Sequence, residues 1–309
     1  MEKEIVSIII LVLFLTSVTY AVRVSDINDA YVRGLVDTAY NLSVDGWAVL
    51  LEMNEFPGGG SGLPVDFINS QRMQTALFSL GWQSDHVYVI HDNLTISNVR
   101  EPVEWLINNT DHDDMALLYK FTHGMWMRNV LQWNDWFPEE WRKLNSSRKI
   151  LMVDTCLAGE FIEPVRDDPS PHISLACCSA DEVSWAGIEE EGLPIIGSVW
   201  NYYFTNALCN SSADSDSSGF VSVEEAFNFS TPLVQRYMNE TVFTVPEFLE
   251  SYHDIGIYPE HYDAYPHPVM DDVYPSQLVI PEFPSPIILP LITITTLLAV
   301  ILSKGKHTK

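Results

Sequence analysis

The feature that most constrains this chain is an apolar strand pattern that ends in a cysteine. Residues 150–153 form a continuous apolar run, and Asp154-Thr155-Cys156 follows directly. Such a run is typical of a strand buried on both faces of a parallel sheet. Ligands bind at the carboxyl ends of strands in open α/β sheets, so we expect Cys156 at a ligand-binding edge. The alternative is a small core residue, a common role for a free cysteine.

A second apolar run favours the first interpretation. Residues 115–119 are apolar and lead through Lys120-Phe121-Thr122 into His123-Gly124. Two neighbouring strands that end in His-Gly and in Cys would bring imidazole and thiol to one sheet edge. The imidazole can then serve as general base for the thiol, and the backbone N–H groups of Gly124 and Cys156 can stabilise an oxyanion. The pattern predicts acyl transfer with Cys156 as nucleophile.

The rest of the chain alternates between strand and helix patterns. Strands are expected over 47–51, 86–90 and 173–178, and helices over 65–80, 95–108, 138–144 and 193–208. This alternation predicts an α/β fold, a three-layer sandwich with a mostly parallel sheet and helices on both faces. Residues 251–280 are rich in Tyr, Pro, His and Asp, and we expect an irregular wrap there that ends in a short strand over 277–280.

These motifs, in this order, resemble the caspase–haemoglobinase clan of cysteine peptidases, and within it the legumain family, which includes the GPI-anchor transamidase subunit. Asp154–Ala158 resembles the transamidase form of the nucleophile strand, Tyr119–Gly124 the histidine strand and Ser179–Ser184 the following Ser-x-x-x-Glu-x-Ser segment. The resemblance spans about residues 45–240. It implies the caspase–haemoglobinase sheet and cysteine endopeptidase activity on a protein or peptide substrate.

The resemblance leaves the specificity open. Legumains hold asparagine with an arginine shortly after the first strand together with acidic residues, whereas that region here contains Asp66 and no arginine. An acidic pocket formed by Asp66 with Asp181, Glu182 or Glu189 would suit a basic side chain. Ser184 is a further predicted substrate-binding residue, because it lies in the segment that resembles the family.

A calcium-binding pattern follows the last predicted helix. Residues 214–225 fit the twelve-residue EF-hand loop, with Gly219 at its sixth position. The predicted oxygen ligands are Asp214, Asp216, Ser218, the backbone carbonyl of Phe220, Ser222 and Glu225. The pattern predicts bound Ca²⁺ as a structural brace; the alternative is a calcium-free polar turn.

Both termini carry apolar segments that predict export. Residues 1–21 read as a signal peptide, 22–46 as a lead-in segment and 47–250 as the peptidase domain. A wrap and linker over 251–285 precede a membrane or sorting helix over 286–303 and a basic cytoplasmic tail over 304–309. The Pro-Glu-Phe motif with this tail resembles archaeal PEF-CTERM sorting signals; a plain tail anchor is the alternative. Either places the domain on the extracellular face of the cell membrane.

Composition excludes two ligand classes and supports export. The net charge of −26 disfavours nucleic acid as a partner. The glycine-rich stretch 54–62 lacks the phosphate-loop pattern and a lysine, so no nucleotide is expected. Asn-x-Ser/Thr sites are frequent, which predicts a glycoprotein. They are Asn41, Asn93, Asn108, Asn145, Asn210, Asn228 and Asn239.

The sequence therefore predicts an exported, membrane-anchored cysteine endopeptidase of legumain type. Two alternatives stay open. One is a transpeptidase or transamidase that acts on cell-surface proteins, since an amine can replace water in acyl transfer. The other is a catalytically inactive surface protein that is braced by calcium and only binds its partner.

Overall fold

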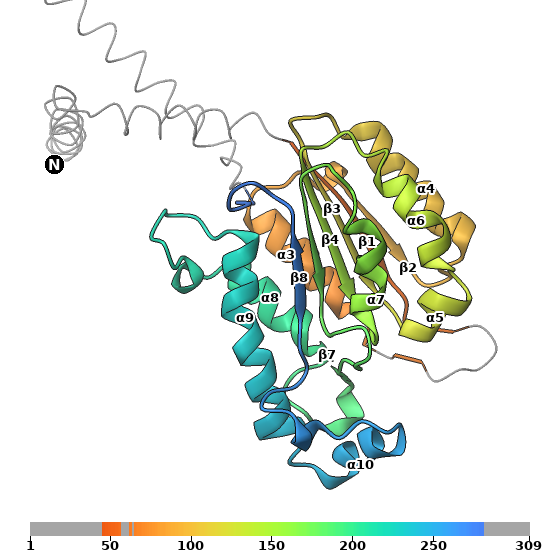
Figure 1. The fold of residues 1–309 in the computed structure, drawn as a ribbon, viewed down its shortest axis with the longest axis vertical. Coiled ribbons are helices and arrows are strands. Elements are labelled where there is room, and N and C mark those ends of the chain that lie inside the picture. The colour runs from red at the N-terminus through yellow and green to blue at the C-terminus, as the bar shows by residue number, and fades with distance from the viewer. Residues whose placement is uncertain (1–44, 57–61, 64, 281–309) are drawn as a thin grey trace, which may run out of the picture. The chain divides into compact units, whose positions relative to one another are not determined.

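The computed structural model describes residues 45–56, 62–63 and 65–280 (Figure 1). The predicted signal peptide, nearly all of the lead-in segment and the C-terminal apolar helix with its basic tail lie outside the described residues. Within the described part of the chain, no helix is both long and apolar enough to cross a membrane.

A six-stranded sheet forms the centre, in the order β2-β1-β3-β4-β5-β8. Neighbouring strands are parallel from β2 to β5, and β8 pairs antiparallel with β5 at one edge. The strands are β1 Gly46–Glu52, β2 Val87–His91, β3 Met115–Phe121, β4 Arg148–Asp154, β5 His172–Ala176 and β8 Val269–Asp272. The predicted α/β fold with a mostly parallel sheet and helices on both faces is confirmed.

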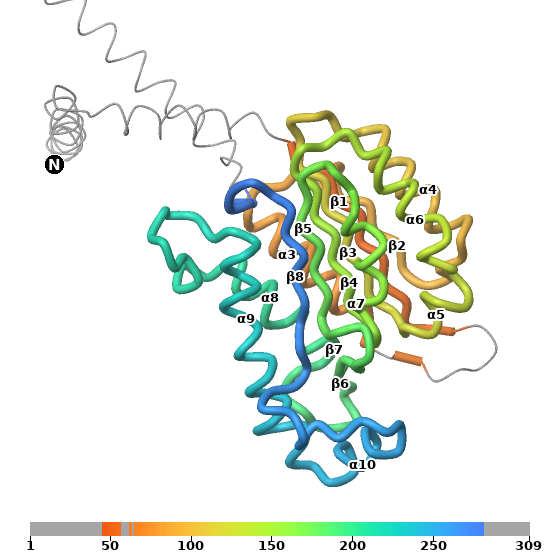
Figure 2. Tube along the Cα trace, in the orientation of Figure 1, coloured from red at the N-terminus to blue at the C-terminus, as the bar shows by residue number. Residues whose placement is uncertain are grey.

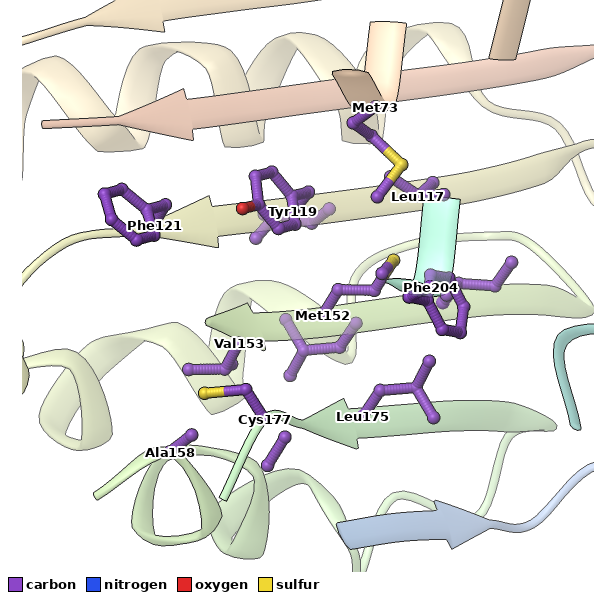
Figure 3. Packing of buried hydrophobic residues seen from close by; sticks show 14 of the residues in the cluster. Met73, Leu117, Tyr119, Phe121, Met152, Val153, Ala158, Leu175, Cys177 and Phe204 are labelled. Carbon is purple, nitrogen blue, oxygen red and sulfur yellow. The ribbon is translucent and has the colours of Figure 1, made fainter. Parts of the chain in front are cut away.

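The central strands are buried on both faces because helices cover both sides of the sheet. Every residue of β3 is buried, and in β4 only Arg148 is partly exposed. Helices α3 and α8 lie on one face, and α4 and α6 lie on the other (Figures 1 and 2). Figure 3 shows the first of these layers, in which Tyr119 and Met152 of paired strands pack with Met73 and Phe204 of the helices. The helices are α3 Ile68–Ser79, α4 Ile96–Asn109, α6 Trp133–Trp141 and α8 Val199–Leu208.

Two helices begin later than the sequence pattern predicts. The helix expected from residue 65 begins at Ile68, because Asp66 and Phe67 have positive φ angles of 49° and 57°, outside the right-handed helical region. The helix expected from residue 193 begins at Val199. Residues before it form a two-stranded ribbon of β6 Ala186–Gly187 and β7 Gly197–Ser198.

The stretch 251–280, predicted as an irregular wrap, holds the end of one helix and one short strand. Helix α9 spans Val223–Tyr237 and helix α10 spans Pro246–Asp254, and β8 then joins the sheet. The strand predicted over 277–280 is instead a single antiparallel bridge between Val279 and Ser222. The stretch is apolar because Leu278 and Ile280 are buried in the core, and not because it forms a strand.

Candidate active site

Strand register brings His123 and Cys156 to the same level of the sheet. Phe121, the last residue of β3, pairs with Asp154, the last residue of β4. Each candidate residue lies two positions further along its chain. Both are half-buried and line one cleft of about 960 Å³. We call this end of β3 and β4, with His123 and Cys156, the catalytic edge.

Gly124 is packed directly against the cysteine. A Cβ atom at this position would lie 2.1 Å from the carbonyl oxygen of Cys156 and 3.4 Å from its Cβ. No side chain fits there, so the sequence His-Gly is a packing requirement of the catalytic edge. Gly124 opens the short helix α5, Gly124–Asn129, for which His123 is the N-cap residue.

Hydrogen bonds fix the turn that carries the thiol. The Thr155 hydroxyl donates to the carbonyl of Thr122, which ties the β4 end to the residue before His123. On the other side, Leu157 has φ of 62° and its N–H donates to the carbonyl of Glu182 at 2.7 Å. The short helix α7, Ala158–Ile162, then continues into the protein. The position of Cys156 is thus held from both flanks.

The Cys156 thiol is uncharged at neutral pH in this environment. Burial, and then the nearby Cys178 thiol, raise its pKa to about 11. Its Sγ lies 4.0 Å from the carbonyl oxygen of Ser184. The thiol therefore needs a base that removes its proton before it can act as a nucleophile. His123 lines the same cleft, and its ring packs against Phe56 with 4.7 Å between ring centroids.

Asp154, the last residue of β4, lies in the core beneath the catalytic edge and does not line the cleft. It is fully buried, and its carboxylate accepts hydrogen bonds from the hydroxyls of Tyr119 at 2.9 Å and Ser198 at 2.8 Å. Burial raises its pKa to about 6, and these two hydrogen bonds offset only part of that effect. Asp154 thereby joins β3, β4 and the start of α8.

A C-terminal segment clamps the loop beside the thiol. We call residues 265–267 the strap. The Tyr265 hydroxyl donates to the carbonyl of Val183 and accepts from its N–H. The buried carboxylate of Glu182 accepts from the N–H groups of Ser179 and His267, and also contacts the His267 ring. The strap therefore fixes the 179–184 segment, whose carbonyl groups contact Cys156 and Leu157.

The predicted substrate-binding residues fall in different places. Ser184 lies next to the thiol through its carbonyl group. The carboxylate of Glu182 is engaged by the strap, as described above. Asp66 is exposed before α3, and Glu189 is exposed on a short 3₁₀ turn, Glu189–Glu191. The cleft around Cys156 is lined by Asp181 and not by Asp66, Glu182 or Glu189.

The cleft walls contain residues that sequence reasoning did not select. One wall is α5 together with its C-cap residue, and includes Met125 and Val130; the other is the turn Ile255-Gly256-Ile257 after α10. The sequence alone leaves open whether the three tryptophans that follow His-Gly line a groove or pack. Trp126 lines the cleft, whereas Trp133 and Trp136 are buried in the core. The only signal for the α5 wall was its position after His-Gly, and nothing in the sequence marked the second wall.

Residues 214–225, which we call the acidic loop, connect α8 to α9 and lie apart from the cleft at Cys156. Oxygen atoms of Asp214, Asp216 and Glu225 lie within 4.8 Å of one another. The Ser218 N–H donates to Asp214 and Asp216, and Gly219 adopts φ of 93°. This all-oxygen donor set suits a hard cation such as Ca²⁺. The two remaining predicted ligands, Phe220 and Ser222, lie in the same loop, and Ser222 also caps α9.

Fold and site together define a class of protein. A mostly parallel sheet of this order, with a cysteine and a histidine at the carboxyl ends of two adjacent central strands, is the architecture of caspase-type cysteine peptidases. Residues 45–248 match the family model for the caspase domain, and the chain belongs to that family. The predicted caspase–haemoglobinase clan is confirmed, while its legumain branch stays a prediction.

Solved structures agree with this fold. The crystal structure of caspase-1 from Spodoptera frugiperda matches with a TM-score of 0.50 and 12% identity, over 78% of this chain and 92% of that one. The structure of pro-sf-caspase-1 matches with a TM-score of 0.51 and 13% identity, over 78% of this chain and 97% of that one. No curated protein matches the chain. At such identities the likeness concerns the fold alone.

Proposed function

We propose that this chain is a cysteine endopeptidase in which Cys156 is the nucleophile and His123 the general base and acid. The observation that carries the proposal is that thiol and imidazole line one cleft at the same level of the sheet. His123 takes the Sγ proton as sulfur attacks the peptide carbonyl, and returns it to the leaving amine when the C–N bond breaks. Water then hydrolyses the thioester. Backbone N–H groups of Gly124 and Cys156 are the proposed oxyanion donors.

Labelling with a peptidyl electrophile tests this proposal. The wild-type chain should be alkylated at Cys156 and should cleave a peptide library, and Cys156→Ala should do neither. Cys209→Ala is the matched control, because Cys209 carries another thiol and is exposed. Labelling that stays at full rate in His123→Ala would contradict the proposed role of the imidazole.

The finer assignment to the legumain type rests on the motifs of the sequence, and Ser184 beside the thiol is compatible with a role in substrate binding. A transpeptidase is the alternative for the same chemistry. If an added amine replaces water, the product mass of a cleaved peptide will rise by the mass of that amine minus water. An inactive binding protein would retain peptide without cleavage or labelling.

Ca²⁺ in the acidic loop is a second proposal, with a structural role. Its ligands would be Asp214, Asp216, Ser218, Phe220, Ser222 and Glu225, and the clustered carboxylates and the glycine turn support it. The ion would supply positive charge that neutralises adjacent carboxylates and would take no part in the reaction. A rise in Tm with calcium but not with magnesium would support it.

Export and anchoring are proposed from the sequence alone. The signal peptide, the 286–303 helix and the glycosylation sites predict a glycoprotein on the extracellular face, held at its C-terminus. Fractionation of the full-length chain with N-terminal sequencing tests this. A chain that retains residue 1 and stays in the soluble fraction would contradict it.

A further inference from the structure

We infer that the cleft at Cys156 selects an apolar side chain next to the scissile bond and rejects an acidic one. This inference rests on the proposed peptidase function and deepens it by naming the substrate class. It follows from three properties of the cleft: the exposure of its apolar walls, the sign of its charge and the way its walls are built.

The first property is an exposed apolar surface that rims the cleft on both sides. Met125 is 54% exposed, Val130 38% and Ile255 60%. All three line the cleft, although exposed large apolar side chains are few in the described part of the chain. Apolar surface in contact with water is typical of a binding surface, because its burial by a ligand is favourable.

The second property is the sign of the charge. The described residues that line the cleft include no lysine or arginine, and Asp181 contributes a carboxylate. A glutamate or aspartate of the substrate would lose its hydration without gaining a cationic partner, which is unfavourable. The net charge of −26 adds a repulsive field. A lysine or arginine side chain can instead approach Asp181, so basic residues rank between apolar and acidic ones.

The third property is that the walls do not depend on these side chains for their own packing. Helix α5 is anchored through Met127, which is completely buried, whereas Met125 and Val130 are exposed. The turn after α10 is held by backbone bonds from Gly256 to His253 and from Ile257 to Tyr252. The exposed apolar side chains are therefore available to a ligand, and Ile255 can be replaced without loss of a core contact.

Two measurements on the full-length chain in detergent test the inference. The first is a cleavage profile over a peptide library in which the positions on both sides of the scissile bond are each varied through all amino acids. We expect leucine, methionine or phenylalanine to exceed aspartate and glutamate by at least about tenfold in kcat/KM. The second is the binding of an apolar and of an acidic peptide to Cys156→Ala, which is monitored through the change in tryptophan fluorescence. The same preference is expected in Kd.

The variant Ile255→Arg supplies the missing positive charge at the rim. We expect it to shift the ratio of acidic to apolar substrates by at least about tenfold in favour of acidic ones. Phe78→Arg is the matched control, because Phe78 is also exposed, at 39%, but lies on α3 away from the cleft. A wild-type preference for acidic residues, or equal ratios in the two arginine variants, would overturn the inference.

The peptidase activity and the apolar preference can fail separately. Absence of cleavage and of labelling in the wild-type chain refutes the proposed peptidase. Binding by Cys156→Ala does not require catalysis, so it tests the apolar preference in either case. If the acidic peptide binds as tightly as the apolar one, the substrate class is wrong even where the peptidase activity is confirmed.

Discussion

The catalytic edge and the acidic loop each contain a buried carboxylate, but the two regions treat it in opposite ways. Burial raises the pKa of Asp154 to about 6, and the two hydroxyls that contact it offset this only in part. Burial also opposes the charge of Glu225, yet hydrogen bonds from Ser222, Ser215 and Asp216 outweigh it and lower the pKa to about 2.

The difference lies in the number of donors that surround each group. The acidic loop directs several N–H and hydroxyl groups at one carboxylate, so it is built to hold negative charge, as a cation site requires. The catalytic edge provides few donors, so burial raises the pKa of both its thiol and its carboxyl group. We therefore expect substitutions at the edge to affect chemistry first, and substitutions in the loop to affect stability first.

The largest effect is expected for His123→Ala. Without the imidazole no group at the catalytic edge removes the proton from a thiol whose pKa is about 11. We expect kcat/KM to fall about a thousandfold, or about 4 kcal/mol in the activation free energy, with little change in Tm. Steady-state kinetics and thermal unfolding of the same preparation check this. An equal fall in Cys209→Ala would show that the loss is not specific to the edge.

Gly124→Ala should combine loss of activity with loss of stability. The new methyl group would lie 2.1 Å from the Cys156 carbonyl oxygen, so the backbone must move. We expect kcat/KM to fall by at least about a hundredfold and the free energy of unfolding to fall by about 1–3 kcal/mol. Gly192→Ala is a control without a steric clash, because open space surrounds that position, although its φ of 67° adds some strain. Unchanged cleavage by Gly124→Ala would mean that the edge is more adaptable than its packing indicates.

The Asp154 carboxyl should give the stability a pH dependence of its own. Its pKa is raised from 3.8 to about 6, so the folded state holds this proton more tightly than the unfolded state. Asp154 therefore favours folding below pH 3.8, and this contribution is lost as the pH rises through 6. Between these limits the wild-type chain should lose up to about 3 kcal/mol that Asp154→Asn does not lose. Urea unfolding of both chains at pH 4 and 7 measures this, and parallel curves would contradict it.

The acidic loop should show the opposite dependence. The pKa of Glu225 is lowered from 4.5 to about 2, so its contribution to stability is complete above pH 4.5 and is lost as the pH falls through 2. Glu225→Gln should flatten this acid limb and should also abolish any rise in Tm with calcium. Glu250→Gln, an exposed glutamate outside the loop, should keep both properties. Cleavage at neutral pH should change least of all.

The meeting of His123 and Cys156 at one edge could be predicted because its signals are local. An apolar run over 115–119 that leads through Lys120-Phe121-Thr122 into His-Gly, and a second one followed by Asp-Thr-Cys, each indicate a buried parallel strand and the residue at its end. The parallel pairing of such strands then places both ends at one edge. Lys120 is buried within this strand all the same, and its Nζ lies 5.1 Å from the centre of the Trp133 ring.

The cleft walls could not be predicted because no periodic pattern marks them. Ile255 and Ile257 belong to a turn, and their position near Cys156 depends on how α10 and the strap return to the sheet. The edge strand β8 is only four residues long and contains two aspartates, so its sequence resembles a loop. Likewise, the role of Glu182 depends on His267, a partner 85 residues away, and spacing in the sequence gives no hint of it.

The strap has a consequence for the order in which the cleft is completed during synthesis. Val183 is bonded to Tyr265, 82 residues further along the chain, and Glu182 to His267. Until residues 265–267 of the nascent polypeptide have emerged from the ribosome, the loop beside the Cys156 sulfur has none of these restraints. The sheet strands that carry His123 and Cys156 emerge much earlier. The ordering of this loop is therefore a late event of translation, and a chain interrupted before Tyr265 would present thiol and imidazole without the neighbour that orders them.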